Sequence, residues 1–91
     1  MAPVLIYVSR SCPYCVRAKQ LLIHKHVAFD EVVVDGQPAL RAEMEQRSGR
    51  RTVPQIWIGD RHVGGCDDLH ELEADGELDA LLAAVAPGMT Q

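Results

Sequence analysis

The feature that most constrains this chain is a pair of cysteines at the point where a strand pattern changes into a helical one. We predict the first strand over Val4–Val8, a continuous apolar run typical of a central strand covered on both faces. The segment Ser11-Cys12-Pro13-Tyr14-Cys15 follows it, and apolar residues then recur at helical spacing to about Lys25. The sequence therefore predicts a strand that leads directly to two thiols at the start of a helix.

The position of Cys12 predicts its chemistry. If Cys12 is the N-cap and Pro13 the first helical residue, proline costs nothing there, because the first-turn N–H groups lack intrahelical partners. The Cys12 sulfur then lies beside the positive end of the helix dipole, which favours thiolate over thiol. Cys15 lies one turn later on the same face, so its sulfur can displace a group attached to Cys12 and close a disulfide. In a reducing compartment, two cysteines at this spacing suggest redox catalysis or metal binding.

The rest of the chain alternates strands and helices in an α/β pattern. We predict a second strand over 29–34, a second helix over 38–48, and strands over 53–58 and 61–63. Asp67 or Asp68 is expected to cap a helix that runs to about Ala74, and residues 78–85 form another helix or continue this one past Gly76. The first two strands should pair in parallel and the last two should form a hairpin. The expected order is βαβαββα, with a four-stranded mixed sheet flanked by helices.

Composition limits the size, partners and location of the protein. A chain of 91 residues that is 47% hydrophobic fits one domain over 1–91, with 87–91 expected as a frayed tail. A net charge of -4 without a Lys/Arg cluster argues against nucleic acid or an anionic membrane as a partner. The first apolar run is too short for a signal peptide or a membrane span, so we expect a cytoplasmic protein. Three cysteines, of which two are close in sequence, do not form the framework of a secreted disulfide-rich domain.

Three motifs carry a resemblance to a known family. They are Cys12-Pro13-Tyr14-Cys15, Thr52-Val53-Pro54-Gln55 and Gly64-Gly65-Cys66-Asp67-Asp68-Leu69, in this order along the chain. The βαβαββα order with Cys-x-x-Cys at the first strand-to-helix junction resembles the thioredoxin fold. Together the three motifs look like a glutaredoxin of the small bacterial dithiol type. The resemblance spans the chain from the first strand through the last helix.

The resemblance implies catalysis by Cys12 and Cys15 and a binding site for glutathione. It implies that Val53–Pro54 is a cis peptide, which leaves the Val53 backbone free to pair with the cysteinyl part of glutathione. At the start of a helix, N–H groups can hold the γ-glutamyl carboxylate, while the Asp67 side chain can accept from its ammonium group. Arg41 is the implied contact of the glycine carboxylate. The complete implied set is Tyr14, Arg41, Thr52, Val53, Pro54, Gly65, Cys66 and Asp67.

One position departs from the pattern of the family. Many relatives carry Lys three residues before the first active-site cysteine, whereas this chain has Ser9 with Arg10 beside it. Ser9 donates a hydrogen bond but supplies no charge, so we expect weaker glutathione affinity and weaker thiolate stabilisation unless Arg10 or Arg51 compensates. Arg10 and Arg51 are therefore additional candidate contacts.

The implied function is a glutathione-dependent thiol-disulfide oxidoreductase that reduces protein disulfides and glutathionylated proteins. Glutathione is then a co-substrate, and we expect a monomer with no tightly bound cofactor and no metal. An alternative of the same fold is a redoxin supplied with electrons by thioredoxin reductase. Asking which reductant sustains turnover separates the two.

Metal binding is the alternative that is not enzymatic. A zinc site could use the nominal Cys₃His set of Cys12, Cys15, Cys66 and His70, and some relatives form an iron–sulfur dimer through the first cysteine. Zinc knuckles hold their ligands in tight turns, whereas Pro13-Tyr14 opens a long amphipathic helix, which favours the redox interpretation. For Cys66 we expect a contact through its backbone rather than its sulfur, because an isolated cysteine is usually a small buried hydrophobic residue.

Overall fold

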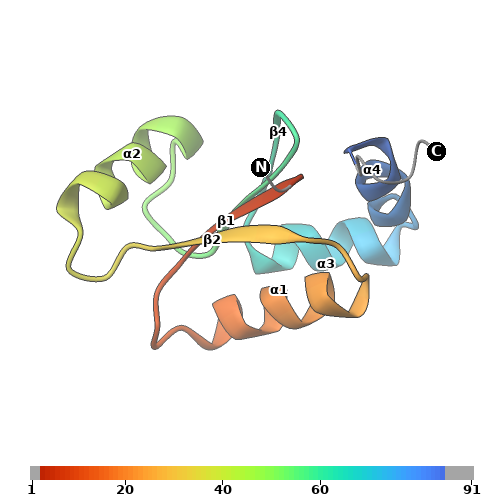
Figure 1. The fold of residues 1–91 in the computed structure, drawn as a ribbon, viewed down its shortest axis with the longest axis horizontal. Helices are drawn as coiled ribbons and strands as arrows, with labels where there is room; N and C mark the ends of the chain where they lie inside the picture. The colour runs from red at the N-terminus through yellow and green to blue at the C-terminus, as the bar shows by residue number, and fades with distance from the viewer. Residues whose placement is uncertain (1–2, 86–91) are drawn as a thin grey trace.

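The computed structural model describes residues 3–85, which form a four-stranded mixed sheet with helices on both faces (Figure 1). The elements are β1 (Val4–Val8), α1 (Pro13–His24), β2 (Phe29–Val33), α2 (Pro38–Ser48), β3 (Gln55–Ile58), β4 (Arg61–Gly64), α3 (Cys66–Ala74) and α4 (Leu78–Val85). The strand order is β2-β1-β3-β4. β1 is parallel to β2 and antiparallel to β3, and β3 is antiparallel to β4. The predicted βαβαββα order is confirmed, and α4 is a separate last helix.

Two cores of unequal size lie on the two faces of the sheet. The larger core packs α1, α3 and α4 against one face, with Ile6, Leu22 and Leu69 fully buried in it. The smaller core packs α2 against the other face, around Tyr7 and Met44. Successive residues of a strand point to opposite faces, so Ile6 and Tyr7 contribute to different cores. β1 is thus the central strand covered on both faces that its continuous apolar run predicts.

Two predicted starts were wrong by two residues or more, and the predicted ends of β2 and β4 were each wrong by one residue. β3 begins at Gln55 instead of residue 53, because Pro54 has no N–H group to donate to a neighbouring strand. The helix predicted to be capped by Asp67 or Asp68 starts at Cys66, and Gly65 is its N-cap. Asp68 lies in the first turn, where its carboxylate accepts from the Gly65 N–H instead of capping the helix from outside. The tail predicted over 87–91 lies outside the described residues.

Candidate active site

The turn between β1 and α1 holds Cys12 as the sequence predicts. Cys12 is the N-cap of α1 with an extended backbone (φ -96°, ψ 111°), and Pro13 follows in the first turn. The Cys12 sulfur accepts a hydrogen bond from the Cys15 N–H at 3.2 Å, as side-chain oxygens do at most helix starts. This bond and the helix dipole both direct partial positive charge at the Cys12 sulfur.

The two thiols of the motif differ in exposure. Cys12 is partly exposed, whereas Cys15 faces the larger core with 1% of its surface exposed. Burial first, and then its hydrogen bond to Cys12, raise the pKa of Cys15 to about 12. Cys15 therefore keeps its proton at neutral pH, and Cys12 is the sulfur that a solute can reach.

Asp35 braces the turn that leads to Cys12. Its two carboxylate oxygens accept from the Ser9 hydroxyl and from the Arg10 N–H, each at 2.7 Å. These bonds, the one from Arg10 first, lower the pKa of Asp35, so the brace is ionised at neutral pH. The Ser9 carbonyl in turn accepts from the Cys12 N–H at 3.4 Å. Ser9 thus contributes to the position of the turn through its hydroxyl, and Arg10 contributes through its backbone.

The loop before β3 faces the Cys12 sulfur. The Val53–Pro54 peptide bond is cis, as the resemblance implied. The Cys12 sulfur lies 3.8 Å from the Val53 carbonyl oxygen, so a molecule attached to that sulfur would lie against the Val53 backbone. Thr52, just before it, is held by the Gln55 side chain, which donates to the Thr52 carbonyl at 2.9 Å.

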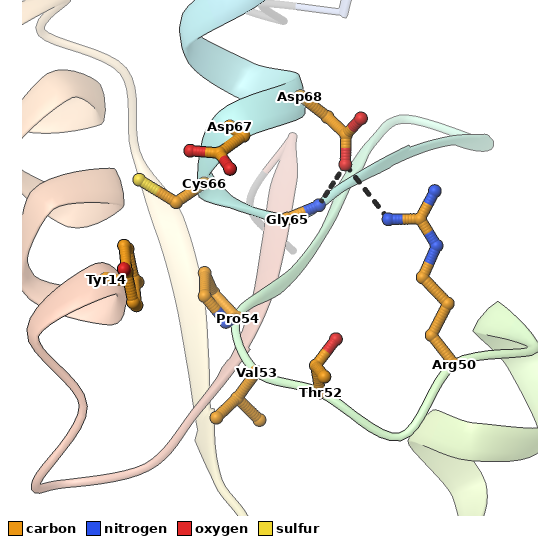
Figure 2. A pocket seen from close by; sticks show the side chains of 9 residues that line it. All are labelled: Tyr14, Arg50, Thr52, Val53, Pro54, Gly65, Cys66, Asp67 and Asp68. Carbon is orange, nitrogen blue, oxygen red and sulfur yellow. Dashed lines mark hydrogen bonds and ion pairs between the residues drawn. The ribbon is translucent and has the colours of Figure 1, made fainter.

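A pocket of about 220 Å³ opens between this loop, the start of α1 and the start of α3 (Figure 2). Its lining residues are Tyr14, Arg50, Thr52, Val53, Pro54, Gly65, Cys66, Asp67 and Asp68. Seven of the eight glutathione contacts implied by the resemblance are among them, and Arg41 is the one that is not. Cys12 and Cys15 do not line the pocket, and Val53, whose carbonyl oxygen lies 3.8 Å from the Cys12 sulfur, connects the pocket to Cys12. Residues more than fifty positions apart in the chain therefore meet at one concave surface next to that contact.

Arg50 and Asp68 line the pocket but were not among the predicted contacts. Their side chains form an ion pair at 2.9 Å, and the same Asp68 oxygen accepts from the Gly65 N–H at 2.8 Å (Figure 2). Gly64 makes this arrangement possible, because a Cβ at its φ of +117° would collide with the Asp68 carboxylate. The neighbouring Asp67 is exposed at the first turn of α3. The adjacent arginines just before Thr52-Val53-Pro54 were the signal that could have indicated Arg50.

Three predicted arginines lie outside the pocket lining. Arg41, on α2, donates through its guanidinium to the Arg51 carbonyl at 3.3 Å. The Arg51 side chain is exposed, as is that of Arg10 in the β1–α1 turn. Arg41 is thus connected to the loop that enters the pocket, although its side chain does not line it.

The nominal zinc set is not brought together. Within residues 3–85, no group of three or more His, Cys, Asp or Glu side chains is placed to hold a metal ion. Cys12, Cys15 and Cys66 are free cysteines, and His70 lies one helical turn after Cys66 on α3. The four residues therefore do not form the Cys₃His site that their spacing allowed.

The sequence model of the glutaredoxin family matches residues 4–63 of this chain. The chain belongs to the glutaredoxin family. The glutaredoxin of Pseudomonas aeruginosa is 63% identical over 84 residues, which cover 92% of this chain and all of that protein. Glutaredoxin 3 of Escherichia coli K12 is 58% identical over 82 residues, covering 90% of this chain and 99% of that protein.

A solved structure of the family supports the same assignment. The crystal structure of a buckwheat glutaredoxin–glutathione complex superimposes with a TM-score of 0.86 at 32% sequence identity, covering 92% of this chain and 79% of that one. Membership of the glutaredoxin family makes the chain a thiol-disulfide oxidoreductase with a cysteine pair on a thioredoxin fold. Among its described residues, no helix has the length and apolar character needed to cross a membrane.

Proposed function

We propose that this glutaredoxin uses glutathione to reduce protein disulfides and glutathione mixed disulfides. The observation that carries the proposal is a pocket lined by polar groups from three segments, in which the carbonyl oxygen of Val53 lies 3.8 Å from the partly exposed Cys12 sulfur. A tripeptide needs donors and acceptors for its own backbone and charges for its two ends. The buckwheat relative, whose structure is a glutathione complex, supports the choice of tripeptide.

Glutathione binding divides among three parts of the pocket. The Val53 backbone pairs with the cysteinyl part, and Thr52, Pro54 and Tyr14 form the walls around it. The N–H groups of Cys66 and Asp67 at the start of α3 bind the γ-glutamyl carboxylate, since a helix N-terminus attracts anions. Asp68 is already bonded to Gly65 and Arg50, which supports Asp67 as the carboxylate that accepts from the ammonium group.

The arginines supply charge for the other end of the tripeptide. We assign the glycine carboxylate to Arg41, with Arg51 and Arg10 as further cations near the opening. The bond from Arg41 to the Arg51 carbonyl supports this assignment, because it holds Arg41 beside the loop that leads to Thr52. Arg50 is a weaker choice, because its guanidinium is paired with Asp68.

The first chemical step belongs to Cys12. Its thiolate attacks one sulfur of a disulfide, forms a mixed disulfide with that half and releases the other half as a thiolate, which takes a proton from water. The exposure of Cys12 and the N–H bond to its sulfur support this role. Cys15 does not compete, because burial keeps its pKa high and its sulfur protonated.

The second step regenerates the enzyme by one of two routes. In one, glutathione in the pocket attacks the glutathionyl sulfur on Cys12, which leaves glutathione disulfide and the free thiolate. In the other, Cys15 attacks the Cys12 sulfur, releases the second substrate thiol and closes a disulfide that two glutathione molecules then reduce. Besides burial, the hydrogen bond and the charge of Cys12 raise the pKa of Cys15, and the effect of the charge disappears once Cys12 is bonded to substrate. Cys15 therefore becomes easier to ionise at the stage where it must attack.

Two cysteine variants test the proposal. Cys12→Ser should abolish turnover of a glutathione mixed disulfide and of a protein disulfide, because the two remaining thiols, Cys15 and Cys66, are buried. Cys15→Ser should retain turnover of the mixed disulfide and lose that of the protein disulfide. Equal loss in both variants would contradict the assigned roles. Replacing glutathione and its reductase by thioredoxin reductase in the same assay should stop turnover, and continued turnover would favour the thioredoxin-like alternative.

A further inference from the structure

Gln55 is the one polar side chain in the buried core of residues 3–85, with 0% of its surface exposed. A buried amide without partners would cost stability, so its hydrogen bonds identify what it holds. Its nitrogen lies 2.9 Å from the Thr52 carbonyl and 3.3 Å from the Thr52 hydroxyl, and its oxygen lies 2.8 Å from His62 Nε2. The amide thus connects the pocket loop to β4.

The chemistry of these groups fixes the direction of each bond. A carbonyl oxygen only accepts, so the amide nitrogen of Gln55 must face Thr52 and its oxygen must face His62. His62 Nε2 therefore has to carry a proton and donate it. Both the Nε2–H neutral tautomer and the imidazolium ion satisfy this requirement, so the bond survives protonation of His62.

The His62 ring is itself held in place. It stacks on Trp57 with 4.7 Å between ring centroids and a tilt of 37°. Trp57 is buried and carries the Arg47 guanidinium 4.7 Å from its ring. The donor to Gln55 is thus fixed by packing on the α2 side of the sheet.

We propose that Gln55 and His62 are positioning residues that hold the Thr52–Val53 backbone at its distance from Cys12. Gln55 binds both the carbonyl and the hydroxyl of Thr52, and the next residue presents its carbonyl 3.8 Å from the Cys12 sulfur. Loss of these two hydrogen bonds would free the segment that pairs with the cysteinyl part of the substrate. The inference rests on the proposed function, because Thr52 and Val53 bind substrate only there.

Two His62 variants separate positioning from packing. His62→Phe keeps an aromatic ring on Trp57 but has no hydrogen-bond donor. His62→Gln instead offers an N–H close to where Nε2 lies. We expect His62→Phe to raise KM for a glutathione mixed disulfide about fivefold to tenfold, the usual effect of one lost hydrogen bond, with kcat within twofold. His62→Gln should restore most of the wild-type KM. The neighbouring exposed Arg61→Gln is the matched control and should leave KM unchanged.

Gln55→Met provides a second test, since it keeps the volume and removes every hydrogen bond of the amide. It should raise KM at least as much as His62→Phe, while the alkylation rate of Cys12 by iodoacetamide stays at the wild-type value because the cap of α1 is untouched. Wild-type KM in His62→Phe, or no recovery in His62→Gln, would overturn the proposal.

Amide hydrogen exchange distinguishes failure of this inference from failure of the proposed function. Exchange of the Thr52 and Val53 amides should be faster in His62→Phe than in the wild type and the Arg61→Gln control, whether or not glutathione is the substrate. If the wild type does not turn over a glutathione mixed disulfide, the proposed function fails. The exchange result still tests whether Gln55 holds Thr52 in place. Unchanged exchange in His62→Phe would refute the positioning role by itself.

Discussion

Each of the three cysteines has a different environment, which separates their chemistry at the scale of the residue. Cys12 is partly exposed at a helix start, and Cys15 is buried behind it. Cys66 lines the pocket with 4% of its surface exposed. Burial raises the pKa of Cys66, and the nearby Asp67 charge raises it while Arg17 lowers it. A thiol in this environment remains protonated and unreactive at neutral pH.

Alkylation measures the reactivity of Cys66 directly. In the Cys12→Ser/Cys15→Ser double variant, Cys66 is the only thiol, and its modification by iodoacetamide can be followed by mass spectrometry. Because a raised pKa lowers the thiolate fraction at every pH below it, we expect folded protein at pH 8 to react at least roughly tenfold more slowly than the same protein in urea. Equal rates in the folded and unfolded protein would show that Cys66 is a reactive thiol.

At the scale of the element, the start of α3 depends on a carboxylate inside its first turn. Asp68 accepts from the Gly65 N–H and from Arg50, which joins α3 to the loop after α2. These bonds, the one from Gly65 first, lower the pKa of Asp68 below its ordinary value of 3.8. Because the unfolded chain binds this proton more tightly, Asp68 stabilises the fold fully above about pH 4, and that stabilisation is lost as the pH falls through the lower folded pKa.

Asp68→Ala should therefore lower the free energy of unfolding by about 1 kcal/mol at pH 7, the usual cost of removing a helix cap. Urea unfolding followed by circular dichroism measures this difference, which should shrink as the pH is lowered from about 4 toward 2. Asp67→Ala is the matched control, since it removes a carboxylate from the same turn without removing the bond to Gly65. If Asp67→Ala lowers the free energy of unfolding as much as Asp68→Ala does, the negative charge at the helix start stabilises α3, and the hydrogen bond to Gly65 does not.

Helices and strands with a local pattern could be predicted from the sequence. The β1–α1 junction with Cys12 as N-cap needed only an apolar run, a proline and the spacing of two cysteines. α2 ends at Gly49, whose positive φ of 73° is the backbone conformation that a glycine at a helix end indicates. Such features depend on residues within about one turn of each other.

The features that could not be predicted from the sequence depend on contacts between distant segments. Val53 and Pro54 continue an apolar run and resemble the start of a strand, although they lie in the loop before β3. Asp68 was predicted as a cap because no local pattern shows that Gly65 is the N-cap. The ion pair of Asp68 with Arg50 also joins segments that are distant in the sequence. The same holds for Gln55, whose burial and partners follow from the pairing of β3 with β4.

At the scale of the whole molecule, the two faces of the sheet are unequally packed. Among the described residues, twelve buried side chains form the core under α1, α3 and α4, whereas four form the core under α2. α2 itself contributes Met44 as its one buried side chain, supplemented by hydrogen bonds from the Tyr7 hydroxyl to Glu43 and from Arg47 to that hydroxyl. Local opening is easiest where few apolar side chains are buried, so α2 should open without the rest of the fold.

Native-state hydrogen exchange should show that α2 opens more easily than the rest of the fold. We expect the amides of α2 to exchange with an opening free energy a few kcal/mol below that of β1 and α1, which exchange only on global unfolding. Met44→Ala should lower the opening free energy of α2 by about 2–5 kcal/mol, or to zero if the wild-type value is smaller. The opening free energy of β1 should change little. Leu22→Ala in α1 is the control, because the same loss in the larger core should lower protection in β1 and α1 alike. Equal protection of α2 and β1 in the wild type would mean that the sheet and all its helices open as one unit, and that Arg41 is held as firmly as Cys12.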